Sequence, residues 1–559
     1  MYHPSPPPAG STNAVDDFQF IELMNAGPDV LDLTGAKFTR GIEYTFANGS
    51  LGPQTRLVLV RNLDAFQSRY GTAINVAGTF SKSLDHGGER ITLIGPLGEP
   101  ILDFSYNDAW EPITDGYGFS LVIANEQAPL SSWNDPSSWR PSAKLGGSPG
   151  TGDGVVTLGT VLINEILSAS TPPRRDAIEL YNPTGNAVDI SHWYLTDDHS
   201  VPAKYAIPEG TVLAPGAYIV LDESQFKADP SAATSFALSS RGEEVYLFSA
   251  DASGTLTGYM DGLSFGGAWP DVTFGRYTNS VGDIQYPAQW RNTLGGPNSG
   301  PEVGPVVISE LGFDPPDRDA EFVELKNLTD QPIKLFDPLI PTNRWRIKGV
   351  GFDFPANVEI APCGLLLVVG GDPAAFRSLH NIPLEVPVYG PYSGALENHG
   401  QAIELQRPNP PDSESDPVPV GYSAVDVVHY DAQSPWPTNR FMAGTSLERL
   451  AANAYGNDPG NWRASSWPGS PGKETPGSDH LLPPRIDSIE VVSGVQASIT
   501  IRFEIGAGQG CVIQYRDTLE QGQWQIARVL DPSPTSCPAV FNDPVPAGRP
   551  ARFYRLSAP

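Results

Sequence analysis

Four carboxylates fall within eight residues of one predicted loop, the densest set of side chains in the chain that could bind a metal ion. The segment reads Asp314-Pro-Pro-Asp317-Arg-Asp319-Ala-Glu321. Hard oxygen ligands on a flexible loop suit Ca²⁺. The segment lacks the glycine and the spacing of an EF-hand, and acidic loops are common in a chain of net charge −29. Two interpretations stand: a calcium site made by Asp314, Asp317, Asp319 and Glu321, or a solvated acidic loop.

The three cysteines are too few for a disulfide scaffold or a cysteine-based zinc cluster. Cys511 and Cys537 lie in one C-terminal segment and could form a disulfide in an oxidising compartment. Cys363 lies in the apolar run IAPCGLLLVV, so we expect a buried small residue rather than a nucleophile.

No catalytic motif is found along the chain. The nucleophile elbow G-x-S-x-G, the phosphate-binding G-x-x-x-x-G-K-[ST], the dinucleotide-binding G-x-G-x-x-G and the zinc motif H-E-x-x-H are all absent. The eight histidines are scattered, and none has a second histidine four residues away with a carboxylate partner. We expect them at the surface or in turns, and we do not expect an enzyme.

One acidic residue recurs in three similar segments, FIELMN, AIELYN and FVELKN, as Glu22, Glu179 and Glu324. Each Glu alternates with apolar neighbours, which predicts a strand whose Glu leaves the core face. A neighbouring loop is a potential hydrogen-bond partner there. Because the residue recurs with its whole surroundings, a role in the fold is favoured over three separate active sites.

The segments around the three glutamates repeat in the same order. A strand follows each Glu segment, then an apolar strand after a Pro-containing turn, then an alternating strand, then a strand that begins with Asp and reaches a Trp. Each copy closes with a Trp-Arg pair and a Gly/Pro-rich tail. A repeat of roughly 150 residues is too long for a solenoid turn and long enough for its own core. We expect the Trp residues to fill or cover the ends of these cores.

Composition narrows the class of protein further. The 57 glycines and 56 prolines are spread along all 559 residues, which excludes long helices and coiled coils. The net charge of −29 argues against a nucleic-acid partner. No apolar run is long enough for a membrane helix, so membrane insertion is not expected.

The repeated segments resemble a known family. VLINEI at 161–166, with IELYNPTGNAVDISHWYLTD after it, resembles the lamin-tail domain, and so does VVISEL at 306–311 with EFVELKNLTDQPIKL. That family is an immunoglobulin-like β-sandwich of animal nuclear lamins, and it also occurs in tandem in secreted and surface proteins of bacteria. The C-terminal pattern VIQYRDTLEQGQWQ…ARFYRL is similar to small fibronectin-type-III-like domains of secreted planctomycete and verrucomicrobial proteins.

Repeats and resemblance together predict an all-β chain of tandem immunoglobulin-like β-sandwiches. The predicted domains are three lamin-tail-like sandwiches at 1–150, 156–300 and 304–477, and a smaller fibronectin-III-like sandwich at 484–559.

The first copy lacks a strand that the other two possess. VLINEI and VVISEL open copies two and three, whereas Met1-Tyr2-His3-Pro4 aligns after that strand. Either the chain is a fragment or mature product of a larger protein, or another chain supplies the strand by addition to an open sheet edge.

The sequence is compatible with three functions. The first is a non-catalytic extracellular or cell-surface structural or adhesion protein, whose partners are other protein chains or a cell-envelope polymer, with self-assembly through strand edges. The second is an accessory binding tail of a secreted nuclease, phosphatase or spore-coat-type kinase. The third is carbohydrate binding through Trp133, Trp139 and Trp467. Calcium, bound by the acidic loop at 314–321, is the one cofactor that the sequence suggests.

Overall fold

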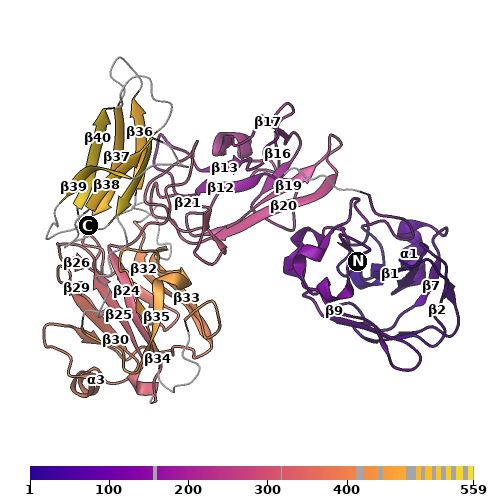
Figure 1. Cartoon of the computed structure of the whole chain (residues 1–559), viewed down its shortest axis with the longest axis horizontal. Coiled ribbons are helices and arrows are strands. Elements are labelled where there is room, and N and C mark those ends of the chain that lie inside the picture. The colour runs from indigo at the N-terminus through magenta and orange to yellow at the C-terminus, as the bar shows by residue number, and fades with distance from the viewer. Residues whose placement is uncertain are drawn as a thin grey trace. The chain divides into compact units, whose positions relative to one another are not determined.

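The computed structural model confirms the all-β class and the immunoglobulin-like sandwiches (Figure 1). It describes residues 1–154, 160–316, 318–410, 421–437, 445–473, 486–492, 498–505, 511–517, 524–530, 537–544 and 552–557. The chain divides into two compact units, residues 1–276 with 286–300, and residues 277–285 with 301–559. The four predicted domain boundaries stay a prediction.

The first sandwich, within residues 1–154, contains two main sheets. Their strand orders are β1-β6-β7 and β4-β3-β8-β9, and two smaller pairs, β2-β5 and β10-β11, accompany them. The elements are β1 (Phe20–Met24), β2 (Leu31–Asp32), β3 (Lys37–Arg40), β4 (Tyr44–Thr45), β5 (Ser50–Leu51), β6 (Arg56–Val60), α1 (Leu63–Tyr70), β7 (Val76–Thr79), β8 (Arg90–Ile94), β9 (Pro100–Ser105), β10 (Leu121–Ile123) and β11 (Trp139–Pro141).

The second sandwich, within residues 160–276 and 286–300, pairs the sheets β18-β13-β12-β21 and β16-β15-β19-β20, with β14-β17 beside them. The elements are β12 (Leu162–Leu167), β13 (Ala177–Tyr181), β14 (Val188–Asp189), β15 (Tyr194–Thr196), β16 (Tyr205–Ala206), β17 (Val212–Leu213), β18 (Tyr218–Asp222), α2 (Glu223–Phe226), β19 (Glu243–Ala250), β20 (Leu256–Phe265) and β21 (Phe274–Gly275).

The third sandwich, within residues 301–473, pairs the sheets β31-β30-β25-β24-β34-β35 and β28-β27-β32-β33, with β26-β29 beside them. The elements are β24 (Val306–Asp314), β25 (Phe322–Asn327), β26 (Ile333–Lys334), β27 (Arg346–Lys348), β28 (Phe352–Asp353), β29 (Glu359–Ile360), β30 (Leu365–Val369), α3 (Pro373–His380), β31 (Val388–Tyr389), β32 (Gly400–Pro408), β33 (Tyr422–Asp431), β34 (Thr445–Arg449) and β35 (Trp462–Ser466). A hairpin of β22 (Tyr277–Thr278) and β23 (Ile284–Gln285) belongs to the same unit.

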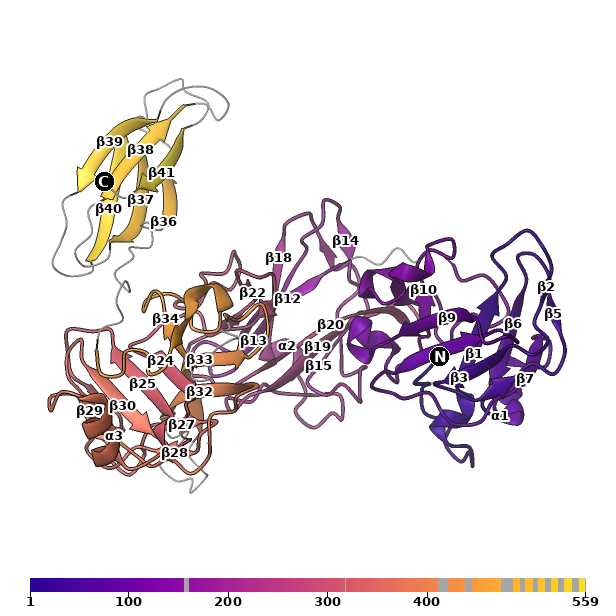
Figure 2. The same ribbon diagram turned by 60° about the horizontal axis from the view of Figure 1, so that its bottom comes forward.

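The C-terminal segment forms two three-stranded sheets, β36-β37-β40 and β39-β38-β41, and Figure 2 shows β38 between β39 and β41. The elements are β36 (Ile486–Val492), β37 (Ser498–Ile505), β38 (Cys511–Arg516), β39 (Gln525–Leu530), β40 (Cys537–Pro544) and β41 (Phe553–Ser557). Ile501, Phe503, Cys511, Ile513 and Phe541 form the buried core of this sandwich.

The patterning of individual strands explains where the cores form. In β8, Ile91 and Leu93 are buried and their neighbours are less so, as expected of a strand with one covered face. In β30 all of Leu366–Val369 are buried, because one face joins the main core and the other packs on Phe376 of α3. Strand β24 is buried nearly throughout, since it lies between β25 and β34.

The Glu strand has a neighbouring strand on both sides in the second and third sandwiches, and on one side in the first. In the third sandwich β25 pairs with β24 on one side and β30 on the other, and in the second β13 pairs likewise with β12 and β18. In the first sandwich, which is described without a gap from residue 1 to 154, β1 pairs with β6 and is the edge strand of its sheet. The chain's N-terminus lies beside β1 (Figure 1).

Candidate functional site

Each recurring glutamate holds the Gly/Pro-rich tail of its own sandwich. The carboxylate leaves the core face, as predicted, and accepts a hydrogen bond from a tail glycine. The three bonds run from the N–H groups of Gly150, Gly295 and Gly472 to Glu22 (2.5 Å), Glu179 and Glu324 (2.7 Å), respectively. The predicted hydrogen bond to a neighbouring loop is thereby confirmed in all three copies.

The strand that precedes the Glu strand adds a second carboxylate in copies two and three. Glu165 of β12 accepts from the N–H (2.8 Å) and hydroxyl (2.7 Å) of Thr293 in the tail. Glu310 of β24 accepts from the N–H of Ser470 (3.1 Å). Two carboxylates on adjacent strands therefore fasten each of these tails across the sheet.

A small polar residue beside that second carboxylate joins the two strands. The side-chain amide of Asn164 donates to Glu179 (2.7 Å), and the hydroxyl of Ser309 donates to Glu324 (2.8 Å). Both residues stand at a β-bulge, where one extra residue lies between paired positions. The bulge turns this side chain toward the carboxylate.

Burial raises the pKa of three carboxylates that hold the tails. It raises the pKa of Glu179 and of Glu310 to about 7, and the pKa of Glu22 to about 6, because a charged carboxylate loses hydration under the tail. Hydrogen bonds from the tail N–H groups oppose the effect of burial. Glu22, Glu179 and Glu310 of the folded chain therefore bind protons more readily than free glutamates do.

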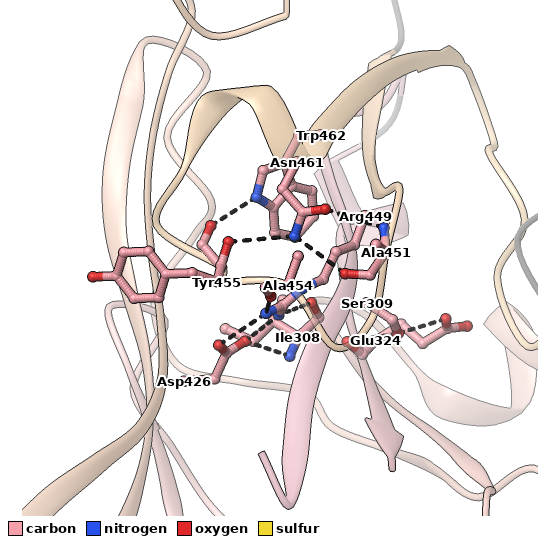
Figure 3. Close-up of polar contacts among 11 residues, drawn as sticks. Ile308, Ser309, Glu324, Asp426, Arg449, Ala451, Ala454, Tyr455, Asn461 and Trp462 are labelled. Carbon is pink, nitrogen blue, oxygen red and sulfur yellow. Dashed lines mark hydrogen bonds and ion pairs between the residues drawn. The ribbon is translucent and has the colours of Figure 1, made fainter. Parts of the chain in front are cut away.

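A buried ion pair secures the first strand of the third sandwich (Figure 3). The side chains of Arg449 and Asp426 are 1% and 4% exposed and lie 2.6 Å apart. Asp426 accepts from the N–H of Ile308 (2.8 Å), and Arg449 donates to the carbonyl of the same residue (3.0 Å). The pair thereby satisfies both backbone groups of Ile308, next to the bulge in β24.

The second sandwich has a related arrangement. Asp261 accepts from the N–H of Ile163 (2.7 Å) and pairs with Arg276 (3.3 Å). Arg276 also donates to the hydroxyl of Tyr286 (2.5 Å). We call this pair, Asp261 with Arg276 or Asp426 with Arg449, the strand latch. The sequence analysis did not predict this ion pair, although the Asp that recurs in the strand reaching a Trp was a usable signal.

The first sandwich has a cavity where the other two have a strand. A cavity of about 500 Å³ lies beside β1 and is lined by Phe20–Met24 of β1 and Leu121–Ile123 of β10. Strand β10 aligns with β34, because Ile123 lies opposite Trp139 as Arg449 lies opposite Trp462. The cavity therefore occupies the position that β24 fills between β25 and β34. We call it the β1–β10 groove.

The predicted calcium ligands that the structure describes do not form one cluster. Asp314, at the end of β24, accepts from the side chain of Asn398 (2.8 Å). Glu321 turns inward and accepts from the hydroxyl of Tyr392 (3.0 Å) and the N–H of Leu396 (2.8 Å). Asp317 lies outside the described residues, and Asp319 is exposed. Within the described ranges no group of three His, Cys, Asp or Glu is placed to hold a metal, and the calcium site stays a prediction.

One of the three cysteines differs from expectation in its burial. Cys511 is a buried free thiol in this structure, whereas the side chain of Cys537 lies outside the described residues, so the disulfide stays a prediction. Cys363 is exposed, and the expectation of a buried residue was wrong. It stands in a turn with φ +52°, just before β30, where Gly216 has φ +69° before β18. Turn geometry, not the apolar run, decides its exposure.

Aromatic and histidine side chains are engaged mainly within the fold. Trp133 and Trp139 pack on each other (5.7 Å between ring centroids), and Trp467 packs on Phe322 (5.9 Å). His3 stacks on His86 at 3.7 Å, and each ring contacts a carboxylate, Asp115 and Asp16 respectively. The sugar-binding role of the three Trp residues stays a prediction.

Comparison with known proteins found one family match. Residues 156–266 match the family model of the Lamin Tail Domain, which supports an immunoglobulin-like module in this stretch. No curated protein and no solved structure matches the chain. The lamin-tail character of the first and third sandwiches, the fibronectin-III-like end and the bacterial type stay predictions. In the part of the chain that the structure describes, no helix has the length and apolarity to cross a bilayer.

Proposed function

We propose that this chain is a non-catalytic structural or adhesion protein of the cell surface or extracellular space. Its sandwiches would bind other protein chains or a cell-envelope polymer. The observation that carries the proposal is the use of the recurring carboxylates. Glu22, Glu179 and Glu324 each fasten a tail to a sheet, so the most regular chemical feature of the chain serves the fold.

One further observation supports this proposal. The lamin-tail match over residues 156–266 supports an immunoglobulin-like module, a class that often presents edges and loops to partners.

The test combines binding with an activity screen. The purified full chain is sedimented with isolated peptidoglycan and envelope polysaccharide, and is assayed on phosphodiester, phosphomonoester and protein-kinase substrates. Saturable co-sedimentation without turnover is the expected result. Turnover that is lost in Asp314→Asn, but retained in the control Asp353→Asn, would overturn the proposal. Glycan binding that is lost in Trp133→Ala would favour the carbohydrate-binding function instead.

A further inference from the structure

The charges of the chain are distributed unevenly, and the C-terminal sandwich differs from the rest. Residues 484–559 contain seven arginines, no lysine or histidine, and seven aspartates and glutamates, so this segment has no net charge. The whole net charge of −29 therefore comes from residues 1–483. A planar guanidinium can pair with a carboxylate or phosphate through two parallel hydrogen bonds, whereas a lysine ammonium acts as a point charge. The exclusive use of arginine suits this sandwich to recognise such anions.

One of these arginines serves the fold. The side chain of Arg552 is 8% exposed and pairs with Asp517 (2.9 Å) and Asp543 (2.8 Å). The hydroxyl of Tyr554 also donates to Asp543 (2.7 Å). The charge of Arg552 is therefore balanced within the sandwich and is not offered to a partner.

Two other arginines lie on the outer face of the sheet β39-β38-β41. Ile513 of β38 is buried in the core, and Leu556 of β41 packs against that core. Because side chains alternate along a strand, Arg516 and Arg555 point to the opposite, outer face. Gln514 lies opposite Arg555, and its side-chain oxygen accepts a hydrogen bond from Nε of that arginine (2.7 Å). This bond orients the guanidinium of Arg555 on the sheet.

The ring of Trp524, directly before β39, orients both guanidinium groups. Its centroid lies 4.7 Å from the guanidinium carbon of Arg516 and 4.5 Å from that of Arg555. Cation–π attraction restricts both side chains, so less rotamer freedom is lost when they bind an anion. Since two cations that share one ring repel each other, the pair favours a ligand that supplies more than one negative charge.

The other described side chains of this outer face are uncharged, and several are apolar. Ile526 of β39 lies opposite Gln514 and is 62% exposed, and Val529 of the same strand is 54% exposed. Phe553 of β41 lies opposite Arg516. No acidic residue occurs among the residues of this face that the structure describes. We call the surface made by Arg516, Trp524, Ile526 and Arg555 the arginine face.

We propose that the arginine face binds an acidic polysaccharide of the cell envelope, whose carboxylate or phosphate groups pair with Arg516 and Arg555. The inference rests on the proposed function, and it names the class of polymer and the surface that binds it. Sugar rings present C–H groups that pack on exposed apolar side chains and hydroxyls that bond to an amide such as Gln514. The face therefore complements an acidic sugar polymer in both charge and polarity.

The negative charge of the other sandwiches favours a flexible polymer over a second copy of this chain. At physiological ionic strength, charges more than about 8 Å apart are largely screened. A polymer can bring successive anions to both guanidinium groups while the rest of its length stays beyond that distance from the acidic sandwiches. A second copy brings a folded surface of net charge −29 with it, and two such chains repel each other.

The test measures binding of the full chain to three immobilised polymers by biolayer interferometry. Polygalacturonate supplies carboxylates, poly(glycerol phosphate) supplies phosphates, and dextran is the neutral reference. Saturable binding to at least one acidic polymer, absent on dextran and weakened by added salt, is the expected result. Binding to neither acidic polymer, or equal binding to dextran, would overturn the inference.

Matched variants locate the binding surface. Arg555→Gln and Arg516→Gln should each weaken binding to the acidic polymer about tenfold or more, because a charge-assisted pair is lost. Arg502→Gln is the control, since it makes the same change of charge in the opposite sheet, at an exposed residue near Glu490 (3.6 Å). The control should bind as the unaltered chain does, and a retained thermal midpoint shows that each variant is folded. Equal affinity of the control and the two other variants contradicts the proposal.

Further outcomes separate this inference from the proposed function. If the chain sediments with envelope polymer and Arg555→Gln does so equally, the scaffold function stands while the arginine face is excluded from it. If the chain binds an acidic polymer but not isolated envelope, the face stands without that part of the function. Oligomers that dissolve in salt and are lost in Arg555→Gln would assign the face to a second copy instead. Tighter binding to a single-stranded oligonucleotide than to either acidic polymer would likewise refute a polysaccharide partner.

Discussion

At the scale of single residues, Glu310 couples folding of the third sandwich to proton binding. Glu310 is fully buried and fastens Ser470, and burial raises its pKa to about 7 from an ordinary value of 4.5. The folded chain therefore binds a proton here more tightly than the unfolded chain does. The stability that this difference provides is complete below about pH 4.5 and is lost as the pH rises through about 7.

At the scale of residues, we predict that the unfolding free energy of the third sandwich depends on pH through Glu310. Between pH 5 and 8 the unfolding free energy of the third sandwich should fall by at most about 3 kcal/mol through Glu310. Urea unfolding at both pH values measures the slope, and Glu310→Gln should reduce it. The control Glu359→Gln, at an exposed position of the same sandwich, should leave the slope unchanged. An equal slope in both variants would contradict the assignment.

At the scale of elements, the recurring asparagines fix the turns that follow the Glu strands. Asn25, Asn182 and Asn327 are almost wholly buried. The amide of Asn327 donates to the carbonyls of Gln331 (2.7 Å) and Ala361 (2.9 Å), and its oxygen accepts from Thr329. One side chain thereby ties the end of β25 to the turn before β30. The same geometry recurs at Asn182, which bonds Asn186 and Leu213.

At the scale of elements, we predict the effect of removing the hydrogen bonds of the Asn327 side chain. Asn327→Ala leaves three carbonyls, one N–H and one hydroxyl without this partner, and should cost about 2–4 kcal/mol. Urea unfolding of the full chain, followed through the third sandwich, measures the loss. Asn398→Ala is the control, because its single hydrogen bond to Asp314 is exposed and should cost about 0.5 kcal/mol or less. If the two variants lose equal stability, the Asn327 side chain does not stabilise the third sandwich in this way.

At the scale of the whole molecule, separate cores should unfold as separate transitions. The large buried clusters of the first, second and third sandwiches share no residue, and the strand latch of Arg449 and Asp426 lies wholly within the third. Calorimetry of the full chain should therefore depart from a single two-state transition. A change inside one core should act on one part of the trace.

At the scale of the whole molecule, breaking the strand latch of the third sandwich should destabilise that sandwich alone. Arg449→Met leaves the buried carboxylate of Asp426 without its cation, and should cost about 3–5 kcal/mol. By calorimetry, one transition should move to lower temperature while that of the first sandwich stays in place. Lys348→Met, which breaks an exposed pair with Glu404, should cost about 1 kcal/mol or less. A uniform shift of the whole trace would show instead that the sandwiches unfold as one.

Much of the architecture was predictable because the chain repeats itself. Three copies of one ordered set of strands predicted the sandwiches, and the alternation around Glu324 predicted a carboxylate that leaves the core. The hydrogen bond to a nearby loop was predicted as well, and Gly472 provides it. The exposure of Cys363 was predicted wrongly, since hydrophobicity averaged over a run says nothing of a positive φ at one turn residue.

Local pattern determined the strands, their inward faces and the class of fold, because those depend on neighbours one or two residues apart. Only the tertiary structure decided which distant groups meet. The backbone of Ile308 is satisfied by Asp426 and Arg449, 118 and 141 residues away. The open groove beside β1 likewise exists only where β1 and β10 come together in space. Such long-range pairing depends on how whole sheets pack, and a pattern of neighbouring residues contains no information on that packing.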